Sequence, residues 1–141
     1  MLTIEAVNTI LEEAFYAEMS YLENSVGGPY RNTMNRSMKT YRKCKTTQEH
    51  GVFTCDSNRY QDGWETVRTK NLVCACVLDE PNHMILIVGS GMMSTNPAVV
   101  ELVFSEHQIE VTAWAKEGLI KQHTARKAVS AVCSTLELAE S

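Results

Sequence analysis

The stretch 71-NLVCACVLDEPNHMILIVGSG-91 decides the fold, because two apolar runs flank a short polar turn. Pro81 suits the second position of a β-turn and Asn82 suits the third. Apolar runs joined in this way predict an antiparallel hairpin. Neither run alternates with polar residues, so we expect both strands to lie centrally in a sheet and to be covered on both faces.

Two further strands are predicted after the hairpin, at 98-AVVELVF-104 and 108-QIEVTAWA-115. Both are rich in the β-branched residues that favour strands. The second also alternates, so its side chains divide between two faces of the sheet. One face receives Ile109, Val111 and Ala113, and the other receives Glu110, Thr112 and Trp114.

The segment before the hairpin supports two interpretations. Met34 and Met38 lie four residues apart, which permits a short helix. Alternatively, residues 40–46 form an edge strand, QEHG at 48–51 forms a turn, and a strand returns from residue 52. With a tight turn there, Cys44 and Cys55 come near one another across a hairpin.

Amphipathic helices are predicted at both ends. Residues 3–23 repeat apolar side chains at spacings of three and four, and Thr3 can cap the start. Residues 117–138 carry a stripe with small side chains, which lets a helix lie close to a sheet. That stripe consists of Ala125, Ala128, Val129, Val132 and Leu136. The sequence thus predicts a single α+β domain over residues 1–141, with an antiparallel sheet of four to six strands covered by N-terminal and C-terminal helices.

Composition indicates an ordinary globular protein of 141 residues, with 44% hydrophobic residues and a net charge of −4. No basic leader or long apolar run is visible, so we expect a cytoplasmic protein with no membrane partner. The five cysteines are an odd number, and we expect all five thiols to be free. Cysteine and histidine spacings do not match known zinc sites, so we expect no metal and no cofactor.

The stretch 85-ILIVGSGMMSTNP-97 resembles the start of a phosphate-binding loop. Gly89 and Gly91 follow an apolar run, but a third glycine is missing and the next residues favour a strand. We therefore interpret it as a strand that runs into a turn. Two flexible apolar residues in a loop either tuck under the sheet or meet a ligand. The predicted ligand-binding residues, at the mouth of a pocket between the sheet and the last helix, are Met92, Met93 and Ser94.

Basic residues gather in one segment that has no acidic residue. They are Arg31, Arg36, Lys39, Arg42, Lys43 and Lys45. Interleaved tyrosines, Tyr30 and Tyr41, suit binding of nucleic acid or another polyanion. The favoured alternative is that this segment packs on the acidic first helix and neutralises it, because the rest of the protein would repel a polyanion.

A second surface is predicted around 113-AWAKEGLI-120. Trp114 lies on the polar face of its strand, and Leu119 and Ile120 lie off the stripe of the last helix. Exposed apolar clusters often mark a protein interface. Two alternatives carry equal weight: these three residues form such an interface, or the first helix or segment 29–45 covers them.

No pattern in the chain indicates catalysis. Cys74 and Cys76 share a strand face, and His83 follows the next turn, but core packing explains these cysteines better than a Cys–His pair. The expected function is therefore that of a non-enzymatic binding or adaptor protein that self-associates. One alternative is a small-ligand-binding protein, and another is a polyanion binder using residues 31–45.

Overall fold

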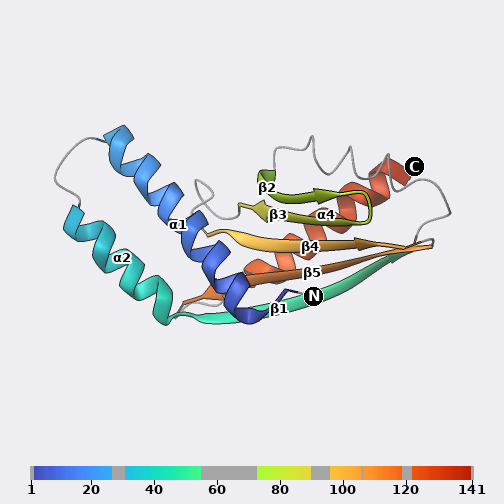
Figure 1. Ribbon diagram of the computed structural model, residues 1–141, viewed down its shortest axis with the longest axis horizontal. Helices are drawn as coiled ribbons and strands as arrows, with labels where there is room; N and C mark the ends of the chain where they lie inside the picture. The colour runs from blue at the N-terminus through green and yellow to red at the C-terminus, as the bar shows by residue number, and fades with distance from the viewer. Residues whose placement is uncertain are drawn as a thin grey trace.

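The computed structural model describes residues 2–26, 31–54, 73–89, 96–105, 107–118 and 122–140. The elements are α1 (Ile4–Val26), α2 (Arg31–Lys43), β1 (Lys45–Thr54), β2 (Val73–Glu80), β3 (His83–Val88), β4 (Ala98–Phe104), β5 (Gln108–Glu117) and α4 (Thr124–Glu140). They form one antiparallel five-stranded sheet flanked by N-terminal and C-terminal helices, which confirms the predicted fold class (Figure 1).

The strand order in the sheet is β1-β5-β4-β3-β2, and every pair of neighbours is antiparallel. Strands β2 to β5 follow one another as a meander, and Pro81 and Asn82 form the predicted turn between β2 and β3. Strand β1 lies outside this meander in sequence but pairs with β5 along its whole length. Because β3 pairs antiparallel with β4, the glycine stretch after β3 is not part of a βαβ unit.

In the segment before the hairpin, the structure confirms the predicted helix and contradicts the predicted turn at 48–51. Residues 31–43 form a helix, and Gln48 to Gly51 continue a ten-residue strand instead of turning. At about 3.3 Å per residue, such a strand holds its ends roughly 30 Å apart. The tight turn predicted to bring Cys44 near Cys55 is therefore wrong; Cys44 is a free thiol, and Cys55 lies outside the described residues.

Strand β2 also corrects a prediction, because it forms an edge of the sheet and not its centre. Ala75, Cys76 and Val77 are exposed, although the run is as apolar as that of β3. Register shifts interrupt its pairing with β3. Hydrophobicity alone thus did not separate this edge strand from the buried β3, whose Met84 and Leu86 are fully covered.

Helices cover the two faces of the sheet with two separate hydrophobic clusters. On one face, Ala128 and Val132 of α4 pack against residues that include Val111 of β5. On the other face, Val7 and Leu11 of α1 pack against Trp114 and its neighbours. This division confirms the predicted alternation of β5, and Figure 1 shows α1 and α4 on opposite sides of the sheet.

Helix α1 is longer than the sheet surface beneath it. Thr3 caps it as predicted, since its Oγ1 accepts a hydrogen bond from the Ala6 N–H at 3.1 Å. Beyond Leu11, α1 packs against α2 instead of the sheet. The two helices extend past the end of the sheet (Figure 1). Among the described residues, no helix is both long and apolar enough to cross a membrane.

Helix α4 approaches β1 most closely at Gly51. A Cβ atom at this position would lie 2.9 Å from Val129 Cγ1, closer than two carbon atoms normally come. The missing side chain therefore lets the helix sit on the strand, beside the small residues of its own stripe.

Replacing Gly51 with alanine should destabilise the fold by about 1–3 kcal/mol through overpacking, measured by urea unfolding. Gly118→Ala is the matched control, because nothing lies within 4 Å of a Cβ there. Adding Val129→Ala to Gly51→Ala should recover part of the loss. Equal effects of the two glycine substitutions would contradict the close approach.

Candidate functional site

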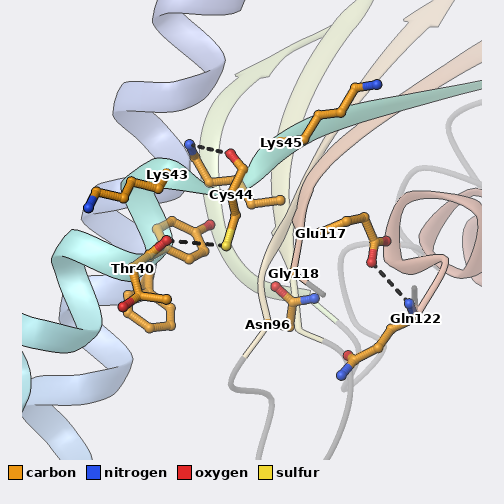
Figure 2. A pocket seen from close by; sticks show the side chains of 11 residues that line it. Thr40, Lys43, Cys44, Lys45, Asn96, Glu117, Gly118 and Gln122 are labelled. Atoms are coloured by element: carbon orange, nitrogen blue, oxygen red, sulfur yellow. Dashed lines mark hydrogen bonds between the residues drawn. The ribbon is translucent and has the colours of Figure 1, made fainter. Parts of the chain in front are cut away.

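A cavity of about 730 Å³ opens where the base of the α1–α2 pair meets the end of the sheet. We call it the junction cavity. Its walls come from α1, α2, the start of β1 and the end of β5. Asn96, two residues before β4, and Gln122, two residues before α4, complete the described lining. Cavities of this size are typical of small-molecule sites. Figure 2 shows Thr40 and Cys44 on one side and Glu117 and Gln122 on the other.

Two stacked aromatic rings line the cavity. Phe15 of α1 and Tyr41 of α2 lie with centroids 4.1 Å apart and planes 4° from parallel. They meet because α2 packs against α1 beyond the edge of the sheet. The pair contributes apolar surface to the cavity wall.

Among the described residues, the Tyr41 hydroxyl has no hydrogen-bond partner. Tyr41 is 6% exposed, and its hydroxyl oxygen is fully covered. Burial raises the pKa of Tyr41 above its usual range, and the neighbouring Cys44 and Glu12 raise it further. The hydroxyl therefore stays protonated at neutral pH, and it is a hydrogen-bond donor with no acceptor.

Lys116, near the end of β5, donates hydrogen bonds to carbonyl groups at the C-terminal end of α2. Its side chain is buried, and Nζ donates to the carbonyl oxygens of Arg42 at 3.2 Å and Cys44 at 3.4 Å. Carbonyl groups at a helix C-terminus need such donors. Nζ also lies 5.5 Å from the centroid of the Tyr41 ring, a cation–π distance.

Lys116 falls between the strand predicted to end at Ala115 and the helix predicted to begin at residue 117. In the structure β5 extends to Glu117, and α4 begins only at Thr124. Extending the alternation of β5 by two residues would have put Lys116 on the same face as Trp114. That was the available signal for this residue.

The opposite wall of the cavity is held by the start of α4. The Glu117 carboxylate accepts hydrogen bonds from the backbone N–H groups of Gln122 at 3.0 Å and Thr124 at 2.8 Å. Asn96 Nδ2 donates to Thr124 Oγ1 at 2.7 Å. The charge of Glu117 is therefore engaged in capping the helix and not free for a ligand.

The predicted ligand-binding residues, Met92, Met93 and Ser94, lie outside the described residues. Asn96, from the same stretch, lines the junction cavity. The cavity lies at the end of the sheet, whereas the pocket predicted from the sequence lies between the sheet and the last helix.

Of the three residues of the predicted interface, the structure describes only Trp114. Trp114 is 2% exposed and packs with Val7 and Leu11 of α1. The structure thus assigns it to the core, the alternative in which the first helix covers it. Leu119 and Ile120 lie outside the described residues, and their role stays a prediction.

The basic segment lies largely on α2. Arg42 Nε is 3.7 Å from Glu12 Oε2 of α1, a contact of the kind expected if the segment neutralises the acidic helix. Lys39, Lys43 and Lys45 are exposed. The side chains of Arg31 and Arg36 are outside the described part, so polyanion binding stays a prediction.

His83 is paired with Glu101 and not with a cysteine. Its Nε2 lies 2.6 Å from Glu101 Oε2, whose carboxylate is buried. The β2–β3 register places Cys76 opposite Leu86, away from His83, and the Cys76 thiol donates to the Leu78 carbonyl. Within the described ranges, no three His, Cys, Asp or Glu side chains gather as a metal site would need.

Replacing Lys116 with methionine keeps the stem but removes the ammonium group. The carbonyls of Arg42 and Cys44 would lose this donor, and we expect a loss of about 1–3 kcal/mol in unfolding free energy. Lys127→Met on the exposed face of α4 is the control and should change stability little. Equal unfolding midpoints for the two variants would show that Lys116 does not stabilise the end of α2.

No protein-family model matches the chain, and no curated protein is significantly similar to it.

Proposed function

We propose that this is a non-enzymatic binding protein that takes a small organic molecule into the junction cavity. The observation that carries the proposal is the cavity itself, which has a volume of about 730 Å³ and is lined by both aromatic and polar side chains. Concave sites of this size and lining are typical of small-molecule binding.

The shape of the cavity supports the same proposal. The Phe15 and Tyr41 side chains contribute apolar surface, and polar side chains that include Thr40, Asn96 and Gln122 also line the cavity. Ligand sites usually combine such apolar walls with a few placed polar atoms. The Cys44 thiol donates to the Thr40 carbonyl at 3.3 Å, so it is a structural donor here and not a nucleophile held by a base.

The neutral dye N-phenyl-1-naphthylamine tests the cavity directly, because its fluorescence rises in apolar surroundings. A ligand of this size and ordinary efficiency should bind with a Kd on the order of 0.1 mM. Gly118→Trp places a large side chain in open space beside the cavity and should weaken binding about tenfold or more.

Gly118→Ala is the matched control and should bind as the wild type does. Circular dichroism checks that Gly118→Trp remains folded. If the dye does not bind, or if it binds Gly118→Trp as tightly as the wild type, the junction cavity is not its site and the proposal fails.

Self-association is a second candidate function, favoured by an uncovered row on the α1 side of the sheet. Glu110 of β5 lies between Val52 of β1 and Val103 of β4 in the register. The two valines are 49% and 39% exposed, because α1 crosses the sheet elsewhere. A second copy of the chain could cover this row.

Replacing Val103 with lysine should shift such a dimer to a smaller species in light scattering, since a charge would be buried in the contact. Val77→Lys is the control, because Val77 is 48% exposed on the edge strand β2, outside this row. A wild type that is monomeric at high protein concentration excludes this function.

A further inference from the structure

We propose that two copies of the chain join through the outer edge of β1, so that their two five-stranded sheets continue into one. The two β1 strands run antiparallel across a two-fold axis, with His50 of one copy opposite His50 of the other. This contact is separate from the junction cavity. It also differs from coverage of the row at Val52, Glu110 and Val103, because a strand edge makes it and not a sheet face.

The two edges of the sheet are built differently. Native edge strands are usually protected by prolines, bulges or covering segments, since their outward N–H and C=O groups can otherwise pair with another chain. Register shifts at two places disrupt the edge strand β2. Strand β1 pairs with β5 through all ten of its residues without a shift and contains no proline. Figure 1 shows it as the outermost strand, so every second residue offers its backbone N–H and C=O to a partner strand.

A second copy of β1 fits this edge in register and in charge. Residues that pair across two strands lie on the same face of a sheet, so β1 can pair with its copy only between positions an even number apart. A pairing centred on Glu49 sets two carboxylates opposite each other, which is unfavourable. A pairing centred on His50 instead sets Glu49 opposite Gly51 and extends over residues 46–54.

Helix α4 supports the same arrangement on one face. It lies over β1 and β5, and with strands about 4.8 Å apart it would lie roughly 10 Å from its copy across the two-fold axis. Packed helices are usually about 8–10 Å apart. The flank of α4 that lies against Gly51 carries Val129 and Cys133, which are only half-buried. The second α4 would cover this flank.

On the opposite face, each copy supplies cover that the other lacks. Helix α1 lies over the first half of β1, where the Thr46 hydroxyl donates to Asn8 Oδ1 at 2.7 Å. The second half is less covered, and Val52 is 49% exposed. The register centred on His50 sets Val52 beside Gln48 of the second copy, two residues from the Thr46 that its α1 contacts. The α1 of one copy therefore lies next to the uncovered half of the other. Two-fold dimers with such self-complementary contacts are the commonest oligomers.

Sedimentation velocity tests the dimer, for which we expect a micromolar Kd in the wild type. His50→Lys should weaken dimerisation about fivefold or more, because it sets two positive charges opposite each other on the axis. His50→Glu should weaken it in the same way. A mixture of these two variants should form a heterodimer at least as tight as the wild-type dimer, since unlike charges then face each other. His107→Lys is the matched control, because His107 is exposed between β4 and β5, and it should dimerise as the wild type does.

Amide hydrogen exchange on the wild type locates the contact without a substitution. Dilution below the Kd should speed exchange in β1, because half of its N–H groups lose their partners. Exchange in β2, the other edge of the sheet, should not change. Val103→Lys should leave this dimer intact, since β4 is separated from β1 by β5.

Several results would overturn the inference. They are a wild type that stays monomeric at millimolar concentration, a mixture of the two His50 variants that stays monomeric, and equal weakening by His107→Lys. Loss of the dimer in Val103→Lys, or exchange that changes in β2 and not in β1, would place the contact elsewhere and overturn it too. None of these results bears on the junction cavity, which the neutral dye tests separately.

Discussion

The structure depends on the alternation of side chains along β5. This strand hydrogen-bonds to β1 on one side and to β4 on the other, so it anchors the two parts of the sheet. Its residues also face both helical layers: Val111 and Ala113 meet the α4 cluster, and Trp114 meets the α1 cluster. The next residue on the α1 side, Lys116, holds the end of α2. One period-two pattern thus joins both cores and one wall of the junction cavity.

Much of the fold could be predicted because local patterns coincide with tertiary structure. The β2–β3 turn, the faces of β5 and the stripe of α4 all follow from short-range periodicity. The interpretation as a turn failed at Gln48 to Gly51 because β1 is polar, and its strand character comes from pairing with β5, far away in sequence. Strand β2 was predicted to be central but lies at the edge, because the apolar content of a strand does not reveal whether it has a neighbour on both sides.

The junction cavity could not be predicted in the same way, since its walls come from segments that are distant in the chain. Tyr41 was noticed as an aromatic among cations, but its role depends on Phe15, which lies on another helix. The orphan state of its hydroxyl is a property of packing and leaves no trace in sequence. Trp114 was predicted to be exposed because it lies on the face of β5 opposite Val111. It is buried because α1 forms a second hydrophobic cluster on that face.

The register of β1 has a consequence for how the chain folds. Strands β2 to β5 are joined in sequence and can pair through local contacts, whereas β1 must find β5 across the intervening meander. Pairings with high contact order form slowly, because loop closure costs entropy before any contact forms. The junction cavity borders both β1 and α2, so it is complete only after this late step. A molecule that binds there stabilises the fully assembled chain alone and leaves partly folded forms unprotected.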